Sequence, residues 1–194
     1  MNATEFSSQF TSPSLDIHGV RLPVFVVEDN YKKKLSIIGD IDNYDFLRRL
    51  CLDGFKTLKL TKDSELYKKY AARVQHELDI IKELGFVDYI LLVWDVINFC
   101  NDNGIPTGYG RGSAAGSLIL YLIGVTKVDP IHYNLYFERF ISRIRAKRQV
   151  IDGITYLDGS LMCDVDLDIC YYNRPRVIAY LEKKFAGRIC KILT

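Results

Sequence analysis

The sequence predicts an α/β (α+β) fold in which helices cover a mixed sheet. In the first half of the chain, apolar residues recur at helical spacing. From Lys147 onward the period becomes two, which is typical of strands. A loop rich in glycine and proline, residues 104–112, separates the two patterns. Strands interleaved with helices in the second half indicate one mixed α/β layer.

Length and composition indicate a single globular domain. The chain has 194 residues, of which 48% are hydrophobic and 26% charged, and this is enough to bury a core. We expect a flexible tail over residues 1–15 and one domain over residues 16–194. No apolar run approaches the roughly 18 residues that cross a bilayer, and no secretory leader is recognisable. We therefore expect no membrane partner.

The cysteines and the net charge narrow the function classes. The five cysteines are scattered and none forms a CxxC pair, which argues against a disulfide framework or a zinc ribbon and favours a reducing, cytoplasmic compartment. The net charge is only +2, whereas a free-standing nucleic-acid binder is usually more basic. Either the chain does not hold DNA alone, or its positive charge is local, as in the basic clusters at residues 32–34 and 143–148.

Three helices are expected in the first half of the chain. The first covers residues 43–55, with Asn43 as its cap. The second is long, begins after possible caps at Asp63 and Ser64, and ends at a glycine. The third covers residues 89–101 and is apolar on most faces, so we expect it to be buried.

The second half is expected to alternate helices and strands. A helix of small and apolar residues over 113–123 follows the glycine loop. Residues 149–151 and 154–157 predict a hairpin, because the intervening Asp-Gly pair supplies the positive φ angles of a two-residue turn. Residues 161–169 predict a further strand. The remaining expected elements are an irregular or edge-strand segment at 16–28, a short helix at 133–140, a helix at 173–185 and a final strand at 188–193.

Three aspartates alternate along the strand expected at residues 161–169. In a strand, successive side chains point to opposite faces, so Asp164, Asp166 and Asp168 would share one face. Neighbouring carboxylates on that face would lie about 7 Å apart, close enough for two of them to bridge hard cations. Like charges on one face repel and Asp is a poor strand former, so a cation such as Mg²⁺ would offset the cost. The plain alternative is an edge strand with a solvated acidic face.

The run GYGRGSAAGS at residues 108–117 is a second candidate site. Glycines let the backbone approach an anion, and a helix start leaves amides unpaired with partial positive charge. These features together predict a phosphate seat, to which Ser113 adds a hydroxyl and Arg111 a charged fork. The run is neither a Walker A loop nor a convincing dinucleotide fingerprint. Small residues here are also compatible with close helix packing alone.

Arg139, in the run FERF at residues 137–140, is a third candidate. Its guanidinium is either a clamp for a triphosphate or a structural group that pairs with Glu138 or another neighbour. The sequence alone leaves both open.

Taken in order, these three features resemble one family. The run GYGRGSAAGSLILYLIGVTKVDPIHYNLYFERF, followed by DVDLDI, is similar to the palm of the bacterial DNA polymerase III alpha subunit, the C-family replicases. The preceding run ELDIIKELGFVDYILLVWDVINFCNDNGIPTG fits the helical stretch before that loop in the same family. The likeness covers residues 65–194, and residues 16–64 more weakly.

The resemblance implies a polymerase-beta-like nucleotidyltransferase palm that takes part in template-directed DNA synthesis. Gly112 and Ser113 would hold the β- and γ-phosphates of the incoming dNTP. Arg111 and Arg139 would neutralise the charge of the triphosphate. The primer 3′-hydroxyl would attack the α-phosphate and release pyrophosphate, with catalysis by positioning and charge stabilisation.

The resemblance also implies a metal site on the aspartate segment. Asp164 and Asp166 would ligate two Mg²⁺ ions, for which Mn²⁺ can substitute. Two such ions stabilise both the attacking and the leaving oxygen of an in-line displacement. Asp168 falls at a position that the family does not assign to metal, so we give it a secondary role.

The sequence departs from the family's pattern between Arg139 and Asp164. The family usually has a short link there with a proline before the first aspartate, whereas this link is longer, carries the expected hairpin and ends in Cys163. We interpret the departure as the mark of a phage- or plasmid-borne relative. The link also carries a basic strip within residues 141–162, formed by Arg143, Arg145, Lys147 and Arg148, which would then contact DNA phosphates or the triphosphate.

Several parts of the family find no counterpart in the sequence: the third catalytic aspartate, the thumb, the fingers and the phosphoesterase domain. We therefore expect residues 16–194 to be the first segment of a palm. A second polypeptide or a downstream region would supply the missing parts, and the DNA primer–template would be held jointly. Residues 1–194 alone are expected to show no polymerase activity.

Two other functions are compatible with these residues. One is a non-catalytic palm-derived subunit or decoy that binds a polymerase partner or DNA, which the missing third carboxylate and the near-neutral charge favour. The other is a small nucleotidyltransferase that acts on a different acceptor, which would not explain the helical match upstream of the loop. The joint presence of Asp164, Asp166, Gly112 and Ser113 favours the catalytic interpretation.

Overall fold

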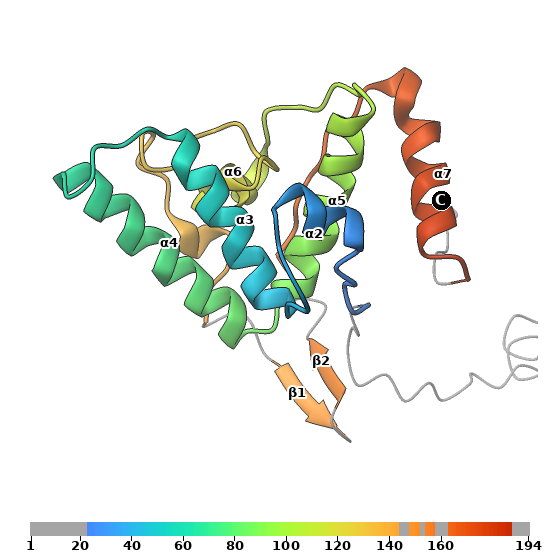
Figure 1. The fold of residues 1–194 in the computed structure, drawn as a ribbon, viewed down its shortest axis with the longest axis horizontal. Coiled ribbons are helices and arrows are strands. Elements are labelled where there is room, and N and C mark those ends of the chain that lie inside the picture. The colour runs from blue at the N-terminus through green and yellow to red at the C-terminus, as the bar shows by residue number, and fades with distance from the viewer. Residues whose placement is uncertain (1–22, 144–147, 152–153, 158–162, 188–194) are drawn as a thin grey trace, which may run out of the picture.

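The computed structural model describes residues 23–143, 148–151, 154–157 and 163–187, and within them helices dominate. The helices are α2 (Asp29–Lys34), α3 (Asn43–Thr57), α4 (Glu65–Glu83), α5 (Val87–Asp102), α6 (Leu118–Leu122) and α7 (Arg174–Lys184). Three short 3-10 turns are η1 (Gly112–Gly116), η2 (Phe137–Arg139) and η4 (Tyr171–Asn173). The strands are β1 (Arg148–Ile151) and β2 (Ile154–Leu157), which lie at the edge of the helical body (Figure 1).

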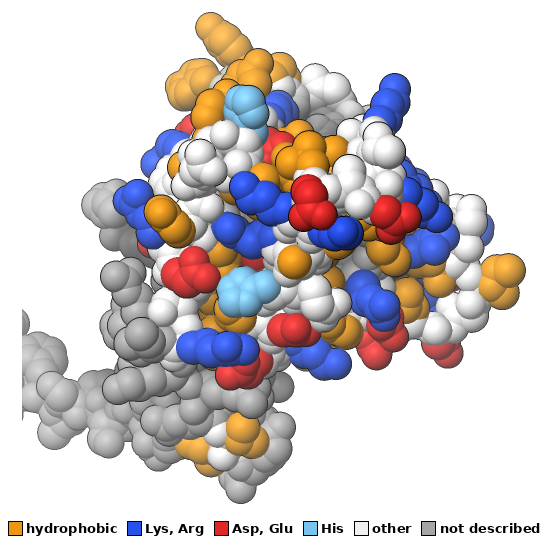
Figure 2. All heavy atoms as spheres, turned by 90° about the vertical axis from the view of Figure 1, so that its left-hand side faces the viewer, with side chains coloured by type: hydrophobic (Ala, Val, Ile, Leu, Met, Phe, Trp, Pro, Cys, Tyr) orange, Lys and Arg blue, Asp and Glu red, His pale blue; other side chains and the backbone are white. Residues whose placement is uncertain are grey.

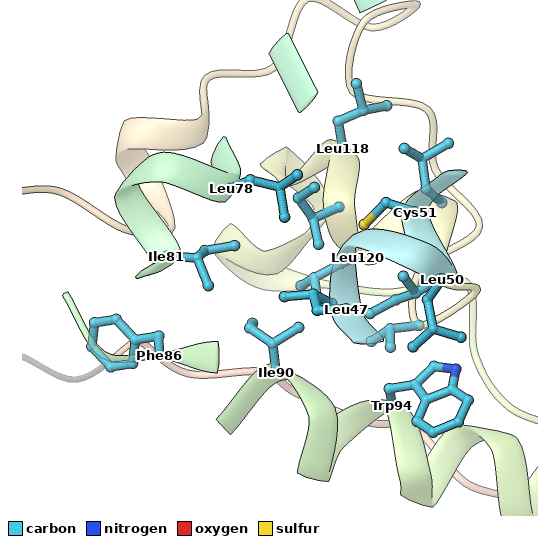
Figure 3. Close-up of a cluster of buried hydrophobic side chains, with 14 of the residues drawn as sticks. Leu47, Leu50, Cys51, Leu78, Ile81, Phe86, Ile90, Trp94, Leu118 and Leu120 are labelled. Carbon is cyan, nitrogen blue, oxygen red and sulfur yellow. The ribbon is translucent and has the colours of Figure 1, made fainter. Parts of the chain in front are cut away.

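Four helices, α3, α4, α5 and α6, enclose the main core. Figure 3 shows apolar side chains from all four converging, among them Leu47 of α3, Ile81 of α4, Ile90 of α5 and Leu120 of α6. Each of these four side chains is fully buried. Burial of one such side chain stabilises a fold by about 1.5–3 kcal/mol, so this contact region fixes how the four helices sit against one another.

The bounds of α3, α4 and α5 lie within about two residues of those expected, but the expected cap of α3 does not form. Ser64 caps α4 as expected, because its side chain accepts a hydrogen bond from the Tyr67 amide. The expected cap of α3 was wrong: Asp42 accepts from the Asp45 amide at 2.8 Å. The Asn43 side chain instead donates to the carbonyl oxygen of the incoming segment.

That incoming segment, residues 23–28, has no regular structure, so of the two expected forms the irregular one is observed and the edge strand is not. It is fixed by Phe25, whose carbonyl oxygen accepts from Asn43 at 2.8 Å and whose amide donates to Asp88 of α5 at 2.9 Å. The Phe25 ring packs against the rings of Phe46 and Trp94 at centroid distances of 6.3 and 6.4 Å. The N-terminal segment therefore closes one side of the core.

The single helix expected at residues 113–123 was wrong. The chain forms η1, passes through Ser117 in an extended conformation (φ −94°, ψ 122°), and only then begins α6. The Ser117 side chain caps α6 by accepting from the Leu120 amide at 3.3 Å. The short helix expected at 133–140 is likewise reduced to η2.

The expected hairpin is confirmed, but the expected mixed sheet is not observed. β1 and β2 pair antiparallel with Ile151 opposite Ile154. In the described part of the chain they form the only sheet. The strand expected at 161–169 was wrong over its described residues: residues 163–168 join no ladder, and Ile169 forms one isolated bridge with Thr107. The tail at 1–15 and the strand expected at 188–193 lie outside the described residues.

Helix α7 docks on α5 through a buried carboxylate. Asp95 of α5 is fully buried and accepts from the Tyr180 hydroxyl and the Lys184 ammonium, both at 2.7 Å. It also accepts from the hydroxyl of Tyr31 in α2. Burial lowers the pKa of Lys184, but its hydrogen bonds, that to Asp95 first, outweigh this and raise it. Asp95 therefore ties α2 and α7 to α5.

Two features of the described residues relate to the composition: the distribution of charge on the surface and the state of the cysteines. Figure 2 shows Lys and Arg side chains interspersed with Asp and Glu on one face, so that face carries no patch of a single sign. Cys51, Cys100, Cys163 and Cys170 are free thiols. Nowhere in the described ranges is there a helix with the length and apolar composition that a bilayer crossing requires.

Replacing Gly54 in α3 with alanine tests the close approach of α3 to α6. A Cβ at Gly54 would lie 2.7 Å from the carbonyl carbon of Leu122 and overlap its oxygen. Glycine-to-alanine in a helix interior usually stabilises by about 0.5–1 kcal/mol, but here we expect a loss of about 1–3 kcal/mol from overpacking. Urea denaturation measures the difference. Asp53→Ala, exposed on the same helix, should change stability by less than about 0.5 kcal/mol; a more stable Gly54→Ala would contradict this packing.

Candidate active site

The glycine loop adopts backbone angles that require glycine at two positions. Gly110 has φ of +101° and Gly112 has φ of +66°, values that side-chain-bearing residues rarely adopt. A Cβ on Gly110 would lie 2.8 Å from the Thr126 methyl group, so the loop packs tightly on this segment. The Lys127 amide also donates to the carbonyl of Tyr109 at 2.7 Å. The shape of the loop is therefore set by residues that follow α6.

The other side of the loop lies against the aspartate segment. The Gly108 amide donates to the Asp168 carbonyl at 2.8 Å, and the Cys170 amide donates to the Pro106 carbonyl at 3.1 Å. A Cβ on Gly108 would lie 2.8 Å from the Cβ of Asp168, so only glycine permits this approach. The glycine loop and the aspartate segment, about sixty residues apart in sequence, are thus held side by side by backbone hydrogen bonds.

The aspartate segment keeps the alternation that the sequence predicted, although it joins no ladder. Cys163 is buried, and Val165 and Leu167 pack against the main core. Asp164 is exposed, and among the described residues it forms no hydrogen bond or ion pair. The alternating burial leaves the carboxylates on the solvent side without the support of a sheet.

Arg111 joins the loop to two of the three carboxylates. Its Nη1 lies 3.0 Å from Asp166 Oδ2, and its Nε lies 3.1 Å from Asp168 Oδ1. A Cβ on Gly112 would lie 3.3 Å from the same Asp166 oxygen. The structure therefore brings together Asp166, Asp168, Arg111 and Gly112, and the side chains involved remain partly open to solvent.

Tyr89 of α5 supports the backbone of the aspartate segment. Nothing in the sequence had indicated this role. Its hydroxyl oxygen accepts a hydrogen bond from the Val165 amide at 3.2 Å, between the two aspartates that flank Val165. Burial, followed by the nearby Cys163, Asp164 and Asp166, raises the pKa of Tyr89 to about 12. The hydroxyl thus stays protonated near neutral pH and serves as a fixed anchor for the backbone.

Glu77 of α4 holds the segment that follows η1, and this residue was also missed. Its carboxylate is fully buried and accepts from the Ser117 hydroxyl at 2.8 Å and from the amides of Leu118 and Ile119 at 3.0 and 3.1 Å. Its fourth donor is the Nε of Arg73, at 2.6 Å. Burial raises the pKa of Glu77, whereas the two amides and Arg73 act to lower it.

This buried carboxylate corrects the sequence-based account of the phosphate seat. The first amides of α6 are already bonded to Glu77, so they are not available to a phosphate. The amides that can serve are those at the front of η1, where the first residues of a helical turn lack partners within the turn. Gly112 is the first residue of that turn.

Arg73 extends the same support to the region of Arg139. Its Nη2 donates to the carbonyls of Gly116 and Leu135 at 2.9 and 3.1 Å. A Cβ on Gly116 would lie 2.6 Å from the carbonyl oxygen of Tyr136, so η1 and the start of η2 are in close contact. Arg73 therefore fixes η2, which carries Arg139, beside the loop.

Two of the predicted site residues, Ser113 and Arg139, form no polar contact with the aspartates among the described residues. Ser113 is half-buried within η1 and Arg139 is exposed on η2. The ion pair of Arg139 with Glu138 that the sequence left open is not formed, and Glu138 contacts His76 at 3.2 Å. In the basic strip, Arg143 is paired with Glu83 at 2.6 Å.

The donor set of the site fits a hard cation only in combination with other ligands. No group of three or more His, Cys, Asp or Glu side chains within the described ranges is placed to hold a metal ion. Mg²⁺ commonly takes one or two protein carboxylates and fills its other positions with water and substrate phosphates. Asp164 and Asp166 are of the right kind and number for such a shared site.

Comparison with known proteins gives one consistent family. Residues 45–194 match the model of the bacterial DNA polymerase III alpha NTPase domain. A DNA polymerase III subunit alpha of Ureaplasma parvum is 41% identical over 165 residues, which cover 84% of this chain and 15% of that protein. Those of Halalkalibacterium halodurans and Chlamydia muridarum are 41% and 36% identical, over 77% and 93% of this chain and 12% and 14% of their own lengths. The chain thus spans less than a sixth of these relatives.

Exchanging the buried carboxylate of Glu77 for an amide tests its role beneath the loop. All four of its partners donate, so the NH₂ group of a glutamine would face donors that it cannot accept from. We expect Glu77→Gln to lower the free energy of unfolding by about 3 kcal/mol, measured by urea denaturation. Asp79→Asn, exposed on the same helix, is the control and should differ from the parent by less than about 0.5 kcal/mol. Equal stability of the two variants would refute this role.

Proposed function

The chain belongs to the bacterial DNA polymerase III alpha family, as the resemblance in its sequence indicated, and on this basis we propose that it binds Mg²⁺ and the triphosphate of an incoming dNTP for template-directed DNA synthesis. The proposed fold is that of a polymerase-beta-like palm. The described helices are compatible with such a fold, in which strands of the remaining polypeptide would complete the sheet.

One observation carries this proposal: a carboxylate, a guanidinium and a glycine at a turn start meet at one point. Asp166 Oδ2 lies 3.0 Å from Arg111 Nη1 and would be 3.3 Å from a Cβ on Gly112. The carboxylate that we propose as a metal ligand therefore adjoins two groups suited to phosphate. A site that bound only a metal ion, or only a phosphate, would not require a carboxylate and a guanidinium in contact.

The charges of these groups favour joint binding of a divalent cation and an anion. Asp164, Asp166 and Asp168 carry three negative charges, and Arg111 balances only one of them. A divalent ion would neutralise the remainder, and a triphosphate would then bind to a site that is no longer anionic. Cation and nucleotide are thus expected to strengthen one another's binding, since each provides charge that the other needs.

In this proposal the chain's residues bind, orient and neutralise. Asp164 and Asp166 hold the metal, and the amides at Gly112 and Ser113 receive phosphate oxygens. Arg111 neutralises phosphate charge, and Arg139 would do so from η2. Bound Mg²⁺ supplies stabilisation of the attacking and leaving oxygens of the displacement.

The primer–template and the remaining catalytic parts are proposed to come from outside the described site. The relatives are several times longer than this chain. A further region of the same polypeptide, or a second one, would supply the third aspartate, the thumb and the fingers. The basic strip within residues 141–162 would contact DNA phosphates, although Arg143 would first have to leave Glu83.

Titration of Mn²⁺ with and without a dNTP tests joint binding. The parent chain should bind Mn²⁺ more tightly when the nucleotide is present, as measured by the relaxation of water protons or by calorimetry. Asp166→Asn removes a metal ligand, and we expect it to lower this affinity at least tenfold, or about 1.4 kcal/mol. Asp102→Asn, which alters a similarly exposed, ion-paired carboxylate beside Lys34, is the matched control and should bind like the parent.

Two results would argue against the proposal. If neither the parent nor Asp166→Asn binds the metal–nucleotide complex, the chain is better described as a non-catalytic palm-derived subunit or decoy. If both bind it equally, the nucleotide lies elsewhere on the molecule.

A further inference from the structure

Asp168 is the one carboxylate of the aspartate segment that holds no ligand in the proposed function, to which it contributes only its charge. It lies beside the loop with its backbone and its side chain both engaged. The Gly108 amide donates to its carbonyl at 2.8 Å, and its Oδ1 accepts from Arg111 Nε at 3.1 Å. Its neighbour Ile169 forms the bridge to Thr107. The position of this carboxylate is therefore set by the backbone of the loop that carries Arg111.

Asp168 and Asp166 contact Arg111 through different nitrogens. Asp168 takes the Nε–H, and Asp166 takes one N–H of Nη1. A guanidinium has five N–H donors, so three remain for other ligands. The hydrogen bond that Nε donates to Asp168 fixes the orientation of the guanidinium plane, because the Nε–H bond lies in that plane. The three remaining N–H groups, one on Nη1 and two on Nη2, can form the paired contacts that phosphates accept.

We propose that Asp168 is a positioning residue for Arg111. It holds the Nε–H so that the terminal nitrogens stay beside Gly112, where phosphate oxygens are to be received. This inference rests on the proposed function, because it assigns Asp166 to the metal and Arg111 to the triphosphate. When Asp166 turns to the metal, the bond from Asp168 keeps Arg111 in place.

The backbone contacts explain why Asp168, and not Asp166, performs this role. The hydrogen bond from the Gly108 amide to the Asp168 carbonyl joins the two backbones without using the side chain of residue 168. The ion pair itself is more than half exposed on both sides. Solvent screens such pairs, so the bond orients Arg111 and adds little to the stability of the fold.

The first test observes Arg111 without any ligand. The Arg111 Nε–H signal is assigned in ¹H–¹⁵N spectra by its loss in Arg111→Lys, and its exchange with water is measured. In the parent chain the hydrogen bond should slow this exchange, and Asp168→Ala should accelerate it about tenfold. Asp53→Ala, similarly exposed at its carboxylate, should leave the signal unchanged. An unchanged exchange rate in Asp168→Ala overturns the proposal.

The second test is a double-mutant cycle on the affinity for dATP with Mn²⁺. Arg111→Ala and Asp168→Ala should each weaken binding about fivefold, and the double variant should bind no worse than Arg111→Ala, since both changes remove one function. Asp168→Ala should weaken binding of Mn²⁺ alone much less than Asp166→Asn does, because it removes a nearby charge and not a metal ligand. Losses that multiply in the double variant, or a loss of Mn²⁺ binding as large as that in Asp166→Asn, would assign Asp168 to the metal and overturn the inference.

The two tests separate the inference from the proposed function. If the parent chain binds no dATP, the proposed function fails, and the Nε–H exchange still decides whether Asp168 holds Arg111. Thermal unfolding monitored by circular dichroism checks that Asp168→Ala folds. Its midpoint should match that of Asp53→Ala, because both carboxylates form exposed ion pairs.

Discussion

The buried carboxylate of Glu77 is the constraint on which the arrangement of the site depends. It is fully buried and accepts four hydrogen bonds, from Arg73, from the Ser117 hydroxyl and from the first amides of α6. Removing one partner of a buried charge is more costly than the net worth of the pair. The end of η1 and the start of α6 therefore have one stable placement against α4, which fixes the position at which the glycine loop ends.

The site itself is assembled from segments that are distant in sequence and fixed independently. Thr126 and Lys127 pack against the loop and fix its shape. The backbone of the aspartate segment is hydrogen-bonded to the Tyr89 hydroxyl of α5. Arg111 connects the loop to this segment. None of these contacts requires a sheet. Buried contacts fix the backbone of the site, and its charged side chains are exposed. Such an arrangement suits a charged ligand, such as a nucleotide with its metal ion.

Local signals in the sequence predicted the elements whose cause is local. The Ser64 cap and the β1–β2 hairpin were found because capping side chains and an Asp-Gly turn act within a few residues. The alternation around Val165 was found because apolar residues must reach the core wherever a segment lies on it. The contact of Arg111 with Asp166 was not predicted: spacing rules do not reach it, and the family resemblance assigned the two residues only to one common site.

Apart from the α3 cap, which Asp42 forms locally, what the sequence failed to predict comes from contacts between segments about forty or more residues apart. The break at Ser117 exists because Glu77 competes for the amides of α6. A signal was present: Glu77 lies seven residues after Tyr70, at a position that the helical repeat assigns to the core. A charge there predicts a buried partner, although not which one.

The central claim is that one site receives both the metal and the triphosphate. Anomalous diffraction from crystals of the chain grown with Mn²⁺ and a dNTP tests it most directly. The account predicts an Mn²⁺ peak in contact with the Asp166 carboxylate, and phosphates in contact with Arg111 and the Gly112 amide. A metal–nucleotide complex bound elsewhere, with Asp166 still paired to Arg111, would contradict it.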